Sequence, residues 1–256
     1  MQCNSNKGYL KIDGCEFYEN ASKTAVLTEW AYSRPFIISN SYFHDNECAV
    51  WDCHADPVLD LSGKIVVKED PDYTKYLFET PLVLSGSLAE GSSIAMSEAS
   101  VEKLMGGFGY ITTGTTEYAV TDDDLEKFDV EGYSNHVKVD VDFNGILDIV
   151  PVANDFTETN ITVTLKDSLD PEESQEKTVL ANIAYLYKNL FTHNGYIFSN
   201  WSTEDQKNAK ALAAYSKDTV MTAQWRLANP SVKIDVEGAT LKATIGNIVD
   251  DFTYTY

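Results

Sequence analysis

The sequence predicts a mainly β chain in three consecutive parts, the first of which ends a right-handed parallel β-helix. A five-residue pattern recurs four times in the first third of the chain: its first and third residues are apolar, its fourth is polar, and its fifth is Gly or Asn. Later segments alternate apolar and polar residues, as half-buried strands do. With 256 residues, the chain can bury a substantial core without a disulfide or a metal ion to stabilise it.

The repeat begins at residues 10–20 and returns at residues 36–46, an offset of 26, and later copies begin at Leu59 and Leu82, 23 residues apart. Alternate residues of each copy are expected to point inward and stack on the residue one turn away. Gly or Asn would take the bend with positive φ between two strands. The predicted ladder of buried side chains is Ile12, Ile38, Leu61 and Leu84.

Two alternatives to the β-helix remain open. A leucine-rich repeat has a similar period, but its consensus needs repeated leucines and a polar Asn at one internal position. Here β-branched and aromatic residues alternate instead, which favours the β-helix. A chance match between four short segments is the second alternative. From about 81 to 151 the chain stays strand-like, for example at 118–120, although the period loosens.

Residues 59–67 followed by residues 82–94 resemble the closing turns of β-helices in large surface proteins of gut Gram-positive bacteria. The resemblance covers about residues 9 to 150. It implies that residues 1–152 form the last turns of a β-helix and the hairpin region that closes it.

The second part, residues 158–226, begins with an alternating strand at 161–165, followed by a polar stretch at 167–178. It resembles the Listeria-Bacteroides repeat, the β-grasp module of internalin-type surface proteins. The residues that match its signature are Gly195, Tyr196, Phe198, Trp201 and Trp225. His193 and Asn200 depart from the pattern. Gly195 is expected to form a tight turn, and the two tryptophans are expected to supply much of a thin core.

The third part, residues 229–256, contains three alternating segments at 232–236, 240–245 and 252–256, separated by turns that contain Gly238 and Gly246. These segments resemble the opening strands of an immunoglobulin-like domain that is cut off. Three strands alone would leave exposed sheet edges.

The composition excludes several classes of partner. Forty acidic and 19 basic residues give a net charge of −21, which repels nucleic acid and anionic lipid. No apolar run is long enough for a spanning helix, so no membrane insertion within the chain is predicted. No secretion signal is recognisable. Met1 is followed by a polar stretch typical of a repeat turn, which indicates a piece of a longer protein.

Two polar clusters contain residue types that can bind metal ions, and neither is predicted to be a metal site. The first comprises His44, Asp45, Asn46, Glu47, Cys48, Asp52, Cys53, His54 and Asp56, whose spacing fits no closed zinc or iron site. The second follows Asp122, where an EF-hand loop would need Gly and Glu but has Lys127 and Tyr133. A solvated turn and a solvated acidic loop are favoured. A disulfide between Cys48 and Cys53 is left open.

These resemblances imply a non-catalytic piece of a bacterial cell-surface or secreted modular protein. It would lie outside the cell or in the cell wall and act as a stalk or as an adhesion or glycan-binding surface. Its partners would be host or bacterial glycans or surface proteins. No catalytic, cofactor-binding or metal-binding residues and no cofactors are predicted.

The alternative function is a fragment of a β-helix polysaccharide lyase or glycoside hydrolase. Such enzymes carry acidic and basic side chains on one outer face of consecutive turns. Asp13 and Asp60 are expected to occupy corresponding repeat positions, with Ser39 and Ser85 in the other two turns. Basic residues are scarce in this region, because Arg34 is the only arginine before Arg226.

Overall fold

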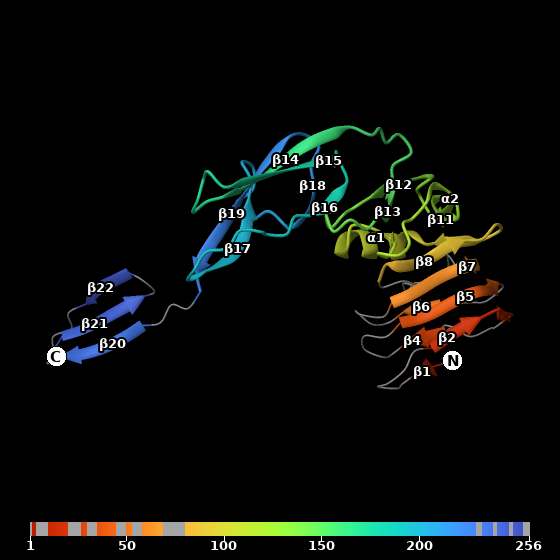
Figure 1. The fold of residues 1–256 in the computed structure, drawn as a ribbon, viewed down its shortest axis with the longest axis horizontal. Coiled ribbons are helices and arrows are strands. Elements are labelled where there is room, and N and C mark those ends of the chain that lie inside the picture. The colour runs from red at the N-terminus through yellow and green to blue at the C-terminus, as the bar shows by residue number, and fades with distance from the viewer. Residues whose placement is uncertain are drawn as a thin grey trace. The chain divides into compact units, whose positions relative to one another are not determined.

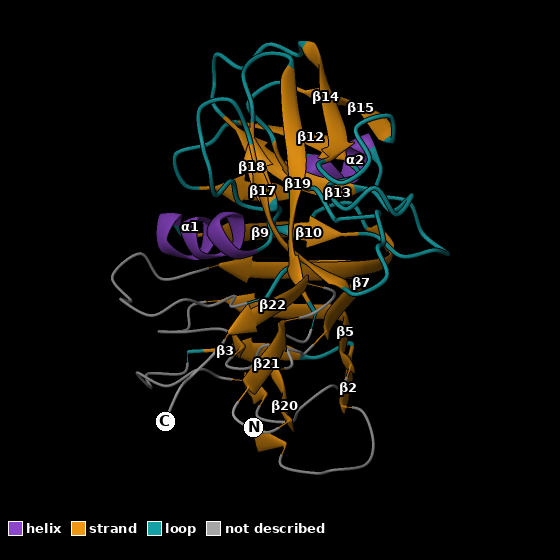
Figure 2. Ribbon diagram, turned by 90° about the vertical axis from the view of Figure 1, so that its left-hand side faces the viewer, coloured by secondary structure: helices purple, strands orange, loops and turns teal. Residues whose placement is uncertain are grey.

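A computed structural model of the chain describes the side chains of residues 11–19, 37–42, 61–66 and 80–228, and the backbone of several strands outside these ranges. The chain divides into two compact units, residues 1–158 with 183–186, and residues 159–182 with 187–256. Strands form most of the regular structure (Figure 2), so the prediction of a mainly β chain is confirmed. In the described part of the chain, no helix is long and apolar enough to cross a membrane.

Unit 1 begins with parallel strands piled on one another (Figure 1), and their pairings form three stacks. The first stack contains β1 (Gln2–Cys3), β4 (Leu27–Glu29) and β6 (Val50–Asp52). The second contains β2 (Leu10–Asp13), the first parts of β5 (Pro35–His44) and β7 (Val58–Lys68), β8 (Leu82–Leu88) and β10 (Thr112–Thr113). The third contains β3 (Glu16–Tyr18), the remainder of β5 and β7, β9 (Ser93–Met96) and β11 (Phe128–Val130).

The register of the second stack is the one that the repeat predicts. Ile12 pairs with Ile38, Ile38 with Leu61, and Leu61 with Leu84, always in parallel. All four side chains are buried and belong to one hydrophobic core. In the first stack, Gln2 pairs with Thr28 and Thr28 with Trp51. These offsets equal those from Ile12 to Ile38 and from Ile38 to Leu61, so both stacks follow the same turns of the chain.

The predicted bend with positive φ occurs in three of the four repeats. Gly14, Asn40 and Gly63 have φ of 63°, 48° and 71°. Gly86 does not have a positive φ, so the prediction is wrong there. The physical reason is a change of register, because Gly63 pairs with Leu88 and the fourth repeat therefore continues differently after Leu84.

Gly63→Ala should destabilise unit 1 more than Gly14→Ala does. Both alanines would bear the cost of a left-handed backbone, about 1–2 kcal/mol. A Cβ at Gly63 would also collide with Oδ1 of Asn40, whereas one at Gly14 meets nothing within 4 Å. Displacing Asn40 breaks its hydrogen bonds with the Lys64 N–H and with Asp13. Chemical denaturation of the two variants measures the difference, and equal losses would contradict the collision.

Unit 1 closes with short elements that the sequence analysis partly missed. Residues 118–120 are not a strand, and α1 (Glu98–Gly107) was not predicted. Its signals were present, because the Ser97 side chain caps the first turn and Val101 and Leu104 are buried one turn apart. The antiparallel pair β12 (Asn135–Val139) and β13 (Asp148–Val152) then joins the sheet, with β13 beside β10.

Unit 2 contains a four-stranded sheet in the order β15-β14-β19-β17. Its strands are β14 (Asn160–Asp167), β15 (Ser174–Leu180), β17 (Tyr196–Ser202) and β19 (Thr219–Leu227). The central pair, β14 and β19, is parallel, and each outer strand is antiparallel to its neighbour. The other strands are β16 (Ala184–Leu186), in unit 1, and β18 (Leu212–Ala214), β20 (Val232–Glu237), β21 (Thr240–Ile245) and β22 (Ile248–Phe252).

The second part contains a strand that the sequence analysis did not name, and one expectation for its core needs correction. The polar stretch at 167–178 contains the start of β15, which is polar because it is an edge strand with one covered side. Trp225 is only half-buried and Tyr196 is exposed, so of the two tryptophans only Trp201 belongs to the buried core. The last strand that the structure describes is β22, which pairs with β21 and reaches the expected segment 252–256 only at Phe252; residues 253–256 lie outside the described residues.

Candidate functional site

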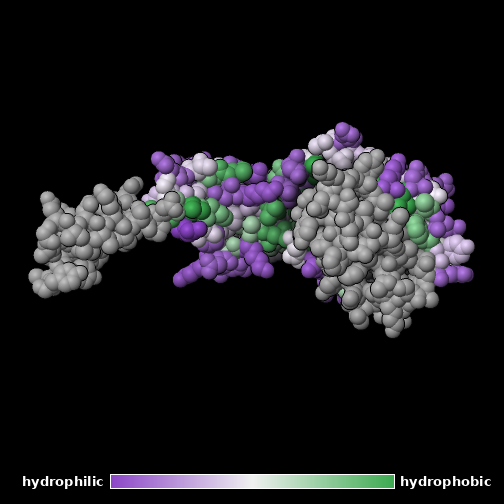
Figure 3. Space-filling model, turned by 90° about the horizontal axis from the view of Figure 1, so that it is seen from below, coloured by the Kyte–Doolittle hydropathy of each residue, from purple (hydrophilic) through white to green (hydrophobic). Residues whose placement is uncertain are grey.

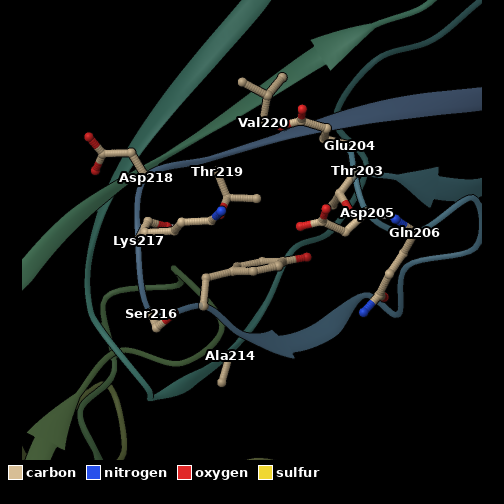
Figure 4. Close-up of a pocket in the computed structure, with 11 residues that line it drawn as sticks. Thr203, Glu204, Asp205, Gln206, Ala214, Ser216, Lys217, Asp218, Thr219 and Val220 are labelled. Atoms are coloured by element: carbon tan, nitrogen blue, oxygen red, sulfur yellow. Dashed lines mark hydrogen bonds between the residues drawn. The ribbon is translucent and has the colours of Figure 1, made fainter.

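An open pocket in unit 2 is the best candidate for a binding site (Figure 4). Its volume is about 380 Å³, and two segments line it, residues 203–206 after β17 and residues 214–220 from the end of β18 to the start of β19. Most of the lining side chains are polar or charged. Figure 3 shows hydrophilic residues over much of the visible described surface.

Local hydrogen bonds hold both segments in place. The Thr203 N–H donates to the Gln206 carbonyl at 2.7 Å, and the Gln206 N–H donates to the Thr203 hydroxyl at 3.1 Å. On the other segment, the Asp218 carboxylate accepts from the Thr162 N–H of β14 at 2.8 Å. The Thr219 hydroxyl donates to the Lys217 carbonyl at 2.9 Å. The rim of the pocket is therefore attached to the sheet and has a defined shape.

Several polar groups at the pocket have no protein partner. In the described residues, the side chains of Glu204, Asp205, Gln206 and Lys217 form no hydrogen bond or ion pair with the protein. Lys217 and Asp205 point toward each other across the cavity (Figure 4). Tyr215 is half-buried, and burial raises the pKa of its hydroxyl. That hydroxyl therefore stays protonated at neutral pH and can both donate and accept.

A second polar cluster surrounds Asp167, at the end of β14. Its side chain is fully buried and accepts from the Leu169 N–H at 2.9 Å and from the Trp225 Nε1–H at 2.7 Å. Nε2 of His193 also hydrogen-bonds to it. Burial raises the pKa of Asp167, but these hydrogen bonds outweigh burial and lower the pKa below its ordinary value. These hydrogen bonds connect β14, the segment before β17, and β19, so the cluster stabilises the structure of unit 2.

The acidic segment at Asp122 is not the solvated loop that was expected. Asp122–Leu125 forms the short helix α2, and Thr121 and Asp124 form a reciprocal cap at its start. Asp124 is buried, and its carboxylate also accepts from the Tyr118 hydroxyl at 2.6 Å and from the Leu88 N–H at 3.0 Å. A buried carboxylate needs such hydrogen-bond partners. Asp124 is the member of the acidic segment that has them.

A different acidic loop joins β12 to β13, and the sequence analysis missed it. Its residues at positions one, three, five and six of an EF-hand pattern are Asp140, Asp142, Asn144 and Gly145. Position twelve is Pro151, where the pattern needs glutamate. The Asp140 carboxylate already accepts from the N–H groups of Asn144 and Gly145 at 2.9 and 2.5 Å. Among the described residues, no three His, Cys, Asp or Glu side chains are grouped as metal ligands would be.

Asp148, at the start of β13, is the most perturbed carboxyl group near this loop. Burial raises its pKa to about 6, and the neighbouring charges of Asp142 and Asp140 act in the same direction. A hydrogen bond from the Val141 N–H at 3.0 Å opposes the rise without cancelling it. Between the ordinary value of 3.8 and about 6, the folded protein therefore keeps a proton on Asp148 that the unfolded chain has already released.

The stability that Asp148 contributes should be present at low pH and lost as the pH rises through about 6. Relative to an Asp148→Asn variant, the parent should gain on the order of 3 kcal/mol when the pH falls from about 8 to about 4. Denaturation of both proteins across this range measures the difference. The comparison with the variant is needed because burial lowers the pKa of His136, so the contribution of His136 to stability is lost as the pH falls and opposes the gain from Asp148. A constant difference between the two proteins would contradict the assigned pKa.

The nine signature residues predicted from the sequence occupy two separate places. Ile12, Ile38, Leu61 and Leu84 form the ladder of unit 1, and Gly195, Tyr196, Phe198, Trp201 and Trp225 lie on or beside β17 and β19 of unit 2. None of them lines the pocket. The cluster of His44 and its neighbours up to Asp56, including Cys48 and Cys53, lies outside the residues whose side chains are described.

The expected alignment of Asp13 with Asp60 is wrong. Asp13 pairs with Ser39 and Ser39 with Ser62, whereas Asp60 pairs with Ile37. Asp60 is therefore two positions before the register of Asp13, in line with Lys11, so the two acidic residues do not occupy matching positions of successive turns. The Asp13 carboxylate instead accepts hydrogen bonds from Ser39 and Asn40, which lower its pKa.

Comparison with models of known protein families, with curated proteins and with solved structures finds no match to this chain. The arrangement of strands, the pocket and the polar clusters therefore carry the functional argument.

Proposed function

We propose that the chain is a non-catalytic piece of a bacterial cell-surface or secreted modular protein. In this proposal, unit 1 is the end of a right-handed parallel β-helix and serves as a stalk. Unit 2 contains a β-grasp repeat of the Listeria-Bacteroides type and provides an adhesion or glycan-binding surface. The last three strands open an immunoglobulin-like domain. The protein acts outside the cell or in the cell wall.

The observation that carries the proposal is the winding of unit 1. Successive turns of the chain add one strand to each stack that they enter, always in parallel and in the same order. A chain that coils in this way buries one side chain from each turn on the next and grows by repetition. Such a coil extends a protein in one direction, which suits a stalk.

The sheet of unit 2 supports the β-grasp assignment. Its two antiparallel pairs lie at the outer edges, and its first and last strands, β14 and β19, pair in parallel at the centre. Gly195 has φ of 82° in the turn before β17, as the signature implies. Trp201 is buried in the core.

The register of unit 1 argues against the polysaccharide lyase or hydrolase. A catalytic face would present carboxylates or basic groups from consecutive turns at matching positions. At the position of Asp13, the next two turns present Ser39 and Ser62. In the described turns, therefore, no second carboxylate pairs in register with Asp13.

Surface labelling and binding together test the proposal. Antibodies against unit 2 should label intact cells of the organism that encodes the chain, and protease treatment of those cells should remove the label. Beads coated with the purified chain should bind to mucin or cell-wall glycans without releasing sugar fragments. Labelling only after permeabilisation, or cleavage of a polysaccharide by the pure chain, would overturn it.

A further inference from the structure

We infer that the open pocket of unit 2 binds a neutral pyranose sugar at the end of a glycan. The inference rests on the proposed glycan-binding function and assigns it a site and a ligand class. The pocket is formed by residues 203–206 and 214–220.

The dimensions of the pocket suit a sugar of one or two rings. Ligand pockets in proteins have volumes of about 300–1,000 Å³, and this one has about 380 Å³. It is an open depression between two surface segments. A terminal sugar can therefore enter while the rest of its glycan stays in solvent.

The lining groups match the chemistry of a pyranose. Each sugar hydroxyl donates one hydrogen bond and accepts others, so it needs acceptors and donors together. The carboxylates of Glu204 and Asp205 accept, and the ammonium of Lys217 donates. The amide of Gln206 does both. The C–H groups on one face of the ring need an apolar surface, which the half-buried ring of Tyr215 supplies.

The polar groups are open to a ligand because the protein does not use them. In the described part of the chain, the side chains of Glu204, Asp205, Gln206 and Lys217 have no hydrogen-bond or ion-pair partner, whereas the backbones of Gln206 and Lys217 are held by the hydrogen bonds of the rim. Two contacts hold Tyr215 in place. The centroid of its ring lies 5.9 Å from that of the Tyr187 ring, and its backbone carbonyl accepts a hydrogen bond from the Asn182 N–H at 2.7 Å. A fixed aromatic ring and fixed segments reduce the ordering cost of binding.

The charges select against an acidic sugar. The rim carries three carboxylates, Glu204, Asp205 and Asp218, and one ammonium, Lys217. The whole chain has a net charge of −21. A uronic acid, a sialic acid or a phosphorylated sugar would therefore meet an unfavourable potential, whereas a neutral sugar would not.

The test is a titration of the full chain, labelled with ¹⁵N, followed by amide chemical shifts. The probes are the methyl glycosides of glucose, galactose and N-acetylglucosamine, with methyl glucuronide as the charged comparison. At least one neutral glycoside should move the amide signals of residues 203–206 and 214–219 saturably, with a Kd of about 1 mM. The glucuronide should move them much less.

Variants separate the pocket from nonspecific binding. Asp205→Ala and Lys217→Ala should each raise the Kd about tenfold, because each removes a charged hydrogen bond to the sugar. Lys207→Ala, an exposed cation outside the pocket, should leave the Kd unchanged. Amide signals elsewhere in unit 2 report whether each variant is folded, and Asp205→Asn and Lys217→Gln replace any variant that is not.

Three results would overturn the inference: no shift at these amides with any neutral glycoside, an equal shift with the glucuronide, or an unchanged Kd in both pocket variants. The bead experiment distinguishes this failure from failure of the proposed function. If coated beads still bind glycans while the pocket amides do not respond, the pocket is wrong and the glycan-binding role stands. If the beads do not bind either, both are wrong.

Discussion

Trp201→Ala should unfold unit 2 and leave unit 1 folded. The Trp201 side chain is 1% exposed, and its ring packs edge-on against Phe191 and Phe198. Its Nε1–H donates to the Tyr187 carbonyl at 2.8 Å. Truncating a buried tryptophan costs about 3–5 kcal/mol, and a module of this size has about 5 kcal/mol of total stability. Most of that stability would be lost.

Hydrogen exchange of the full chain, resolved by peptide, measures this effect. Peptides from β14 and β19 should lose their protection in Trp201→Ala, and peptides from β8 should keep theirs. Lys207→Ala is the matched control, because its side chain is exposed and only its backbone carbonyl is used, by Asn200. Normal protection of β14 in Trp201→Ala would contradict the assignment of Trp201 to the core.

The repeat in the first third of the chain predicted structure well because its signal comes from many residues at once. Each residue of the ladder had to match at an offset of 26 or 23, and the backbone pairs them at those offsets. Trp201 was also predictable, because in a small module a large aromatic residue close to a turn glycine has few places other than the core.

The pocket was not predictable from the sequence. Glu204, Asp205 and Gln206 lie in a polar connection, and Lys217 lies in a turn ten or more residues later. No short motif links the two segments, and only the pairing of β17 with β19 brings them to the same end of the sheet. For the same reason Asp148 looked like an ordinary strand residue, because its raised pKa depends on burial and on the charges that the hairpin folds back toward it.

His193 illustrates a departure whose meaning depends on a distant residue. The Listeria-Bacteroides pattern that residues 158–226 resemble usually has a basic or polar residue at this position, and the departure alone does not indicate a role for His193. In the structure His193 hydrogen-bonds to Asp167 and packs edge-on against Trp225, with ring centroids 4.7 Å apart. Since Trp225 also donates to Asp167, the three residues form one unit across β14, the segment before β17, and β19.

Asp167→Ala should destabilise unit 2 by about 3 kcal/mol at neutral pH. The substitution leaves the Leu169 N–H and the Trp225 Nε1–H without their acceptor, and each lost partner costs about 1–3 kcal/mol. The stabilising effect of Asp167 has a definite pH dependence, because its pKa is lowered from the ordinary value of 3.8. A lowered pKa contributes stability that is present above 3.8 and lost as the pH falls through the folded value.

The stability of unit 2, measured by hydrogen exchange at neutral and at acidic pH, tests both statements. The parent should lose stability on acidification below 3.8, and Asp167→Ala should lose less, because it lacks the group that titrates. Asp205→Ala is the matched control, since it removes an exposed carboxylate without a protein partner and should change stability by less than about 0.5 kcal/mol. If Asp167→Ala and Asp205→Ala behave alike, the hydrogen bonds to Asp167 do not stabilise unit 2, and the fold of this module rests on Trp201 and its aromatic neighbours without a polar anchor.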